Sequence, residues 1–337
     1  MNAFEWASPT SVEEAVQLLA EIQADDSYEA ARPMAGGQDL LTTMKDHILR
    51  PPRVVNLKTI SGLDQVASDA SGNLTIGPLV KLYEIESHPA ILQNFPGLAQ
   101  AAESIATVQL RHQGTIGGNL CQRPRCWYFR LEQITCLKKG GDTCYAQKGE
   151  NKYHCIFGGG PSYIVHPSDT ATMLVALDAQ ITITGPDGKR DLPLAKFFTL
   201  PADADSEREN VLKDGELLTE IRVPATAYAK RSAYVKFKER ASLDFAMAAA
   251  AAAVEIGPDQ RVLQARIVLG GVAPIPWRVP NAEAVLVGKA LSDQTIAAAA
   301  EEALSGAQPL AKNAYKIPLT KALVRRALAK LNGPAQA

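Results

Sequence analysis

Cysteine is absent from residues 1–120 and from residues 156–337, and all five cysteines lie in the 35 residues between them. A secreted scaffold held by disulfides spreads an even number of cysteines over its length, so this distribution argues against disulfide bridges. An odd set gathered in one segment favours thiolate ligation of a soft metal or an iron–sulfur group.

An excess of charge of either sign is also missing, since 35 Lys and Arg face 36 Asp and Glu. A basic face for nucleic acid or membrane headgroups is therefore not expected. No apolar run reaches the roughly 18 residues of a membrane span, and residues 1–6 do not resemble a signal peptide. We expect a cytoplasmic protein without membrane insertion, or a periplasmic one if a partner subunit carries the export signal.

No Ser/His/Asp arrangement, carboxylate pair or phosphate-loop lysine motif stands out in the sequence, so no catalytic residue is expected. Helical and strand patterns follow one another, which predicts an α+β fold. Residues 201–215 are rich in charge and are expected at the surface. Residues 247–256 are ambiguous, because their alanines favour a helix while the apolar runs that follow favour an antiparallel sheet.

Two glycine-rich segments are candidates for binding an anionic ligand. Paired glycines let a backbone approach a ligand closely and expose N–H groups to it. Each segment alone is as typical of a simple turn, but two of them, about eighty residues apart, fit a dinucleotide between two lobes. The candidate residues are Ala35, Gly36, Gly37, Gln38, Asp39 and Leu40 in the first, and Thr115, Ile116, Gly117, Gly118 and Asn119 in the second.

Two further positions suit a nucleotide site. Ser168 and Asp169 follow a turn, where an acid can accept from a ribose hydroxyl, although the same pair is typical of a helix N-terminus. Lys236 and Lys238 lie on an expected strand and could approach a flavin, although a lysine at a strand end is usually solvated.

The cysteine spacing, counted from Cys126, leaves nine, seven and ten residues between successive cysteines. This is not the C-x2-C pattern of zinc ribbons or ferredoxins, yet thiolates alone suit a [4Fe–4S] cluster or zinc. Residues 121–160 have no regular period, so we expect a loop-like insert that its ligand organises.

With these features the chain resembles the FAD-binding medium subunits of the molybdenum hydroxylases, the xanthine dehydrogenase and carbon monoxide dehydrogenase family. The resemblance spans nearly the whole chain, and a cysteine-bearing insert is similar to the [4Fe–4S] type found in periplasmic aldehyde oxidoreductase and 4-hydroxybenzoyl-CoA reductase. The residues that carry it are the two glycine segments, Ser168-Asp169, Gly270-Gly-Val-Ala-Pro274 and Arg278. Gln38 departs from the family, where Thr is common.

The resemblance implies a two-lobed FAD-binding domain at residues 1–224, with lobes at 1–60 and 61–224 and the insert at 121–160. It implies a smaller C-terminal α/β domain with an antiparallel sheet at residues 229–332. The glycine segments would hold the pyrophosphate of FAD, with Asp169 near the flavin nucleotide and Lys236 near the isoalloxazine. The cluster ligands implied are Cys126, Cys136, Cys144 and Cys155, which leaves Cys121 as a packed spare.

The function implied is electron transfer through FAD and a [4Fe–4S] cluster. A partner large subunit would hold the molybdenum cofactor and act on an aldehyde or an aromatic or N-heterocyclic substrate. A small partner would carry [2Fe–2S] clusters, and FAD would exchange electrons with an external acceptor. The alternatives are a zinc-stabilised scaffold subunit, the flavoprotein subunit of an aromatic acyl-CoA reductase, and a free-standing FAD oxidase, for which the chain shows no covalent flavin anchor.

Overall fold

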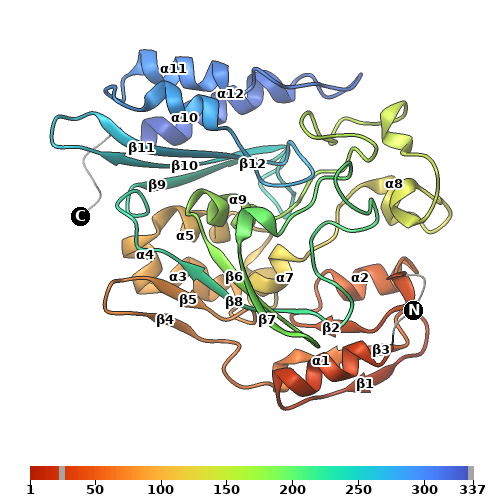
Figure 1. Ribbon diagram of the computed structural model, residues 1–337. Helices are drawn as coiled ribbons and strands as arrows, with labels where there is room; N and C mark the ends of the chain where they lie inside the picture. The colour runs from red at the N-terminus through yellow and green to blue at the C-terminus, as the bar shows by residue number, and fades with distance from the viewer. Residues whose placement is uncertain (23–26, 333–337) are drawn as a thin grey trace.

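The computed structural model describes residues 1–22 and 27–332, so residues 23–26 of the expected first lobe lie outside the described residues. Three sheets and their covering helices follow one another through the molecule, with the cysteine-bearing segment along one side (Figure 1). Within the described ranges, no helix is both long and apolar enough to span a membrane.

The first sheet is small and parallel, with the order β1-β3-β2. Helix α1 covers it and begins where Ser11 accepts a hydrogen bond from the Glu14 backbone N–H. The expected amphipathic face of α1 is confirmed, since Ala15, Val16 and Leu19 are buried. The elements of this lobe are β1 (Glu5–Ala7), α1 (Val12–Ala20), η1 (Ser27–Glu29), β2 (Arg32–Met34), α2 (Leu40–Lys45), β3 (Arg53–Asn56) and η2 (Leu57–Thr59).

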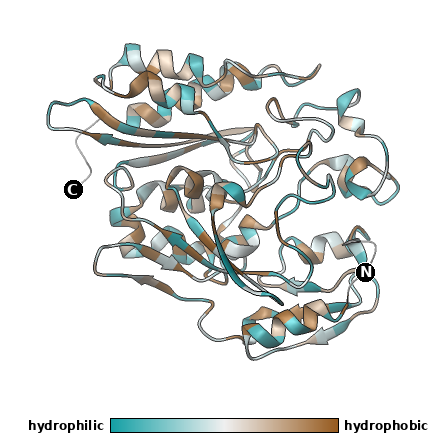
Figure 2. Cartoon of the chain, viewed as in Figure 1, coloured by the Kyte–Doolittle hydropathy of each residue, from teal (hydrophilic) through white to brown (hydrophobic). Residues whose placement is uncertain are grey.

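The second sheet is antiparallel, with the order β4-β5-β8-β6-β7. Its edge strand β7 is exposed and hydrophilic (Figure 2), whereas the central strands and the helices beside them form the largest apolar core. Its strands are β4 (Val66–Ser68), β5 (Leu74–Ile76), β6 (Gln180–Gly185), β7 (Gly188–Pro193) and β8 (Leu217–Val223), and its helices are α3 (Leu82–Ser87), α4 (Pro89–Asn94), α5 (Pro96–Glu103), α6 (Val108–Arg111), α7 (Ile116–Leu120), α9 (Asp169–Ala176) and η5 (Leu194–Lys196).

The third sheet is the expected antiparallel sheet of the C-terminal part, with the order β12-β11-β10-β9. Residues 248–256 form its strand β10, so their alanines do not make a helix. Both faces of β10 are buried, with α12 on one and α5 and α9 on the other, and small side chains allow these layers to approach. Its elements are β9 (Ser232–Phe237), β10 (Ala248–Ile256), β11 (Val262–Gly270), β12 (Trp277–Arg278), α10 (Pro280–Leu286), α11 (Asp293–Glu302) and α12 (Lys316–Lys330).

The cysteine-bearing segment is loop-like, as expected, and contains only short helical turns. These are α8 (Trp127–Arg130), η3 (Leu137–Lys139) and η4 (Tyr145–Gln147). It lies beside α2 and against the start of α12 (Figure 1). The expectation that residues 201–215 are surface residues is wrong in one respect, because Glu209 is buried there.

Candidate functional site

One cavity of about 540 Å³ lies between the first lobe and the rest of the chain. This volume falls in the ordinary range for small-molecule and cofactor sites. Ten of the eleven candidate residues in the two glycine segments line it, together with Asp169 and Lys236. Ile116 is buried in the apolar core instead, and Ser168 lines a neighbouring cavity.

The first glycine segment has the geometry expected of an anion cradle. A Cβ on Gly36 would lie 2.1 Å from the carbonyl oxygen of Gln113, which lies just before the second glycine segment. Only glycine therefore allows the first segment to pack this closely against that part of the chain. Gly37 has φ of +72°, a conformation that favours glycine. Among the described residues, no internal acceptor takes the backbone N–H of Gly36, Gly37 or Gln38. These N–H groups are available to a ligand.

The second glycine segment was expected to be an open loop with free N–H groups, and this prediction is wrong. It forms α7, and Thr115 caps this helix by accepting from the Gly118 N–H at 3.2 Å. The N–H groups of Ile116 and Gly117 donate to carbonyls of the chain before α3, and Asn119 donates to Thr115. Its glycines therefore serve close packing, because a Cβ on Gly117 would lie 2.6 Å from Pro78. Gly118 leaves room at the cavity wall.

Asp39 lines the cavity, and its carboxylate is occupied by the cysteine-bearing segment. It accepts from the Arg123 backbone N–H at 2.7 Å and pairs with Arg125 at 2.7 Å and Arg130 at 2.8 Å. Burial raises the pKa of this carboxyl, but the two guanidinium charges outweigh that effect and leave the pKa below its usual value. Asp39 therefore positions the first glycine segment on the insert.

Asp169 and Lys236 form a buried ion pair at the cavity wall, with 2.7 Å between the two charged groups. The second carboxylate oxygen of Asp169 accepts from the Tyr234 hydroxyl at 2.5 Å. Burial, with the Asp169 charge, raises the pKa of Tyr234 well above its ordinary value. Asp169 thus holds Lys236 in place on β9. Lys238, the other lysine considered, bonds to Ser242 and is not among the cavity-lining residues.

Ser168 joins the second glycine segment to α9. It caps α9 by accepting from the Ala171 N–H at 3.0 Å, and its hydroxyl donates to Asn119 Oδ1 at 2.6 Å. The Thr170 hydroxyl donates to the same oxygen at 2.6 Å. The capping role expected for Ser168 is confirmed, and the side chain of Asn119 is committed to this contact.

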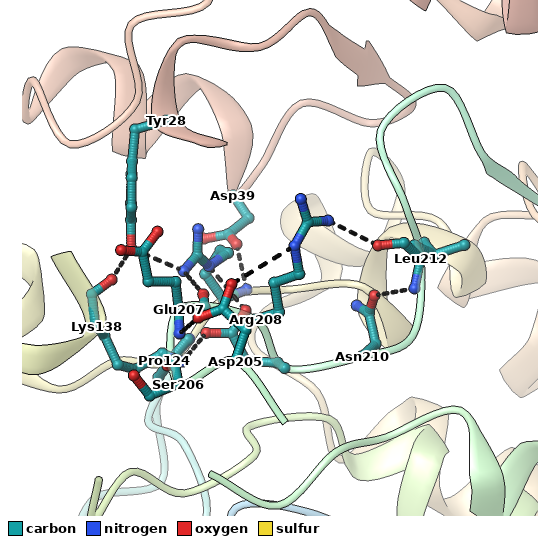
Figure 3. A network of polar contacts seen from close by, with 12 residues as sticks. Tyr28, Asp39, Pro124, Lys138, Asp205, Ser206, Glu207, Arg208, Asn210 and Leu212 are labelled. Atoms are coloured by element: carbon teal, nitrogen blue, oxygen red, sulfur yellow. Dashed lines mark hydrogen bonds and ion pairs between the residues drawn. The ribbon is translucent and has the colours of Figure 1, made fainter. Parts of the chain in front are cut away.

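A buried charge cluster that the sequence did not predict closes another side of the cavity. Glu209 pairs with Arg123 at 2.8 Å and with Lys138 at 2.7 Å, and Lys138 donates to the Ser206 carbonyl (Figure 3). Burial raises the pKa of the Glu209 carboxyl, but these two cations outweigh it and lower the pKa below its usual range. Its local sequence, Glu207-Arg208-Glu209, has only the pattern of an exposed charged turn.

Three of the four expected ligands lie together. Cys126, Cys136 and Cys144 line one small void, whereas Cys155 is buried and is not among the residues that line it. Cys121 lies apart, on the wall of the 540 Å³ cavity. All five are free thiols. Over residues 1–22 and 27–332, no three His, Cys, Asp or Glu side chains converge as a single metal ion would require.

The surroundings of two of these thiols disfavour the charged thiolate. Burial raises the pKa of Cys126 to about 11 and that of Cys155 to about 12, so neither ionises at neutral pH unless a bound cation supplies positive charge. The His154 Nε2 atom lies 3.2 Å from the Cys126 sulfur, within hydrogen-bond distance. Hydrogen bonds to sulfur are among the features that tune iron–sulfur clusters.

Comparison with known families identifies the class of this chain. Residues 2–226 match the FAD-binding domain of molybdopterin dehydrogenases, and residues 232–331 match the C-terminal domain of the CO dehydrogenase flavoprotein. The chain therefore belongs to the family of FAD-binding medium subunits of the molybdenum hydroxylases, a family of oxidoreductase subunits.

Individual relatives match over most of their length. The chain is 34% identical to the aldehyde oxidoreductase FAD-binding subunit PaoB of Escherichia coli K12, over 90% of this chain and 92% of that protein. It is 29% identical to the carbon monoxide dehydrogenase medium chain of Hydrogenophaga pseudoflava, over 96% of both. A crystal structure of that dehydrogenase superposes with a TM-score of 0.75 at 28% identity, covering 98% of this chain and 97% of the other.

Proposed function

We propose that the chain binds FAD in the 540 Å³ cavity and passes electrons through it as the medium subunit of a molybdenum-cofactor complex. The observation that carries this proposal is the single cavity to which the two glycine segments, Asp169 and Lys236 all contribute. Its volume and its position between two lobes suit an elongated dinucleotide.

Each wall of the cavity has a distinct task in this proposal. The free N–H groups of Gly36, Gly37 and Gln38 bind the pyrophosphate, because oriented backbone N–H groups favour an anion. Gly118 allows the backbone of α7 to approach the cofactor. Lys236, held by Asp169, places a fixed positive charge beside the bound cofactor. FAD, when bound, exchanges one or two electrons.

A [4Fe–4S] cluster on Cys126, Cys136, Cys144 and Cys155 is the second part of the proposal. It is supported by the void that Cys126, Cys136 and Cys144 share apart from Cys121, and by the contact of His154 with the Cys126 sulfur. Phe129 and Trp127 surround this site with aromatic rings. The proposal keeps the expected domain bounds, 1–224 with the insert at 121–160, and 229–332.

The complex would contain a large molybdenum-cofactor subunit, a small [2Fe–2S] subunit and an external electron acceptor. The substrate class proposed is an aldehyde, because PaoB is named as part of an aldehyde oxidoreductase and has 34% identity to this chain. An aromatic or N-heterocyclic substrate remains the alternative.

An ultraviolet–visible spectrum of the anaerobically purified chain, with flavin, iron and zinc quantified, tests both parts. We expect flavin bands over a broad brown absorbance, with about one FAD and about four irons per chain, as a cubane cluster requires. Flavin without iron would refute the cluster and leave the FAD site. A colourless protein that contains zinc and no flavin would refute the proposal in favour of a scaffold subunit.

A further inference from the structure

Arg125 lies where the cysteine-bearing segment meets the cofactor cavity. It directly precedes Cys126, and its guanidinium pairs with Asp39 of the first glycine segment at 2.7 Å. The same guanidinium lies over the ring of Phe245 at 4.8 Å. Arg125 is therefore fixed from both sides, by a charge and by an aromatic face.

One donor of Arg125 is left over in this arrangement. Its Nη1 pairs with Asp39 and its Nη2 donates to Gln122 at 3.3 Å, whereas Nε is buried without a hydrogen-bond partner. A buried N–H without an acceptor is costly. Nε has almost no accessible surface, so a ligand in the cavity would meet the other atoms of this side chain, which is 27% exposed.

Arg125 also marks the junction of two cavities. The second cavity, of about 330 Å³, shares with the first the residues Arg125, Pro167, Asp169, Leu243, Asp244 and Phe245. The wall of the first cavity includes Arg125 at this junction and Lys236, which are paired with Asp39 and Asp169, whereas the wall from the first lobe includes the apolar residues Ala31, Leu49 and Leu57. The part of FAD that becomes negative on reduction is the flavin ring, so the wall with these two ion pairs suits the ring and the apolar wall suits adenine.

We propose that Arg125 contacts the flavin ring of bound FAD through its guanidinium and favours the reduced, negatively charged form of the ring. The inference rests on the proposed function and adds a residue from the cysteine-bearing segment to the FAD site. Uptake of two electrons and one proton leaves one negative charge on the ring, and a fixed guanidinium stabilises that charge more than it stabilises the neutral oxidised ring.

Arg130 provides a matched control. It pairs with the same Asp39 oxygen at 2.8 Å and lies in the same segment, but it lines neither cavity. Loss of either arginine removes one partner of Asp39, and only the loss of Arg125 removes a charge from the wall. Both substitutions should therefore disturb the first glycine segment, but only the loss of Arg125 should change the properties of the flavin ring.

The test measures the two-electron reduction potential of FAD, by dye-equilibrated titration, in the full chain with Arg125→Gln, Arg125→Lys or Arg130→Gln. We expect Arg125→Gln to weaken binding of reduced FAD about tenfold more than binding of oxidised FAD, which lowers the potential by about 30 mV. Arg125→Lys keeps the charge and is expected to shift the potential less, and Arg130→Gln is expected to keep the wild-type potential.

Two outcomes would overturn the inference while leaving the proposed function intact. One is an Arg125→Gln variant that binds FAD at the wild-type potential. The other is an equal effect of Arg125→Gln and Arg130→Gln on potential or on FAD occupancy, which would reduce Arg125 to a partner of Asp39. Loss of FAD from Arg125→Gln alone would support the contact. A wild-type chain that binds no FAD would refute the proposed function, and this inference with it.

Discussion

Substitution of Asp39 by Asn should weaken FAD binding, although the carboxylate itself is committed to the cysteine-bearing segment. The change keeps the side-chain size and one oxygen for the Arg123 N–H, but it removes the charge that pairs with Arg125 and Arg130. Gly36, Gly37 and Gln38, whose N–H groups are free, directly precede this residue. Their placement therefore depends on the lost contacts.

The magnitude follows from burial. Removing one partner of a fully buried ion pair costs about 3–5 kcal/mol. The side chains here are 17% exposed for Asp39, 27% for Arg125 and 13% for Arg130, so solvent reduces the cost to about 2–3 kcal/mol. If the glycine segment bears the whole cost, the FAD dissociation constant rises by about 30- to 150-fold, at 1.4 kcal/mol for each factor of ten.

The assay is the FAD dissociation constant, measured by flavin fluorescence on the deflavinated full chain, together with the melting temperature. Asp142→Asn is the matched control. Asp142 lies in the cysteine-bearing segment that Asp39 contacts, is exposed, and accepts a hydrogen bond from its neighbour Thr143. A double-mutant cycle with Arg130→Gln should show an interaction of about 1–2 kcal/mol, since both changes disrupt one network. Wild-type affinity in Asp39→Asn, or strict additivity in the cycle, would refute the argument.

Three further substitutions test other parts of the site. Gly36→Ala should abolish FAD binding, because the new Cβ would lie 2.1 Å from the carbonyl oxygen of Gln113. Gly306→Ala is the control and should bind FAD normally, because no atom lies nearer than 3.9 Å to its new Cβ. Lys236→Met should lower the unfolding free energy by about 3–5 kcal/mol, since it leaves a buried carboxylate unpaired, and Lys238→Met should change it by less than about 0.5 kcal/mol. Glu209 has a lowered folded-state pKa, so its stabilisation is present above its unfolded-state pKa of about 4.3 and is lost as pH falls through the folded-state value. Thermal melts from pH 3 to 7 should therefore show a shallower acid loss in Glu209→Gln, with lower stability at pH 7, and parallel curves would contradict this.

The sequence predicted the parts of the site that local chemistry determines. Glycine pairs mark close backbone approach wherever they occur, so the sequence alone could place Gly36 and Gly118 at a ligand wall. The helix cap at Ser168 follows from a local rule of the same kind. The antiparallel C-terminal sheet could be expected from its apolar runs, although the alanines left its first long strand ambiguous.

The rest depended on contacts between residues far apart in the chain. The sequences of the two glycine segments do not show which N–H groups are free and which are bonded. The difference arises because the carbonyl oxygens of Pro78 and Val80 accept from N–H groups of the second segment only. The sequence around Glu209 is typical of an exposed charged turn, whereas in the structure Glu209 is buried and pairs with Arg123 and Lys138. The three partners of Asp39 lie 84 to 91 residues away, so its contacts with the cysteine-bearing segment could not be predicted. No local pattern reports such pairings.

The cysteine-bearing segment forms part of the wall of the 540 Å³ cavity, and the same contacts link the two proposed cofactors. Its Arg125 and Arg130 hold Asp39 on one side. On the other side, Asn313 before α12 donates to the carbonyl oxygen of Cys155 at 3.0 Å, which ties the last cysteine to the C-terminal part of the chain. A loop between two such attachments cannot rearrange around a ligand without moving the first glycine segment. Loading of the thiols and binding of FAD should therefore depend on each other, and the Asp39 network is the connection through which they do so.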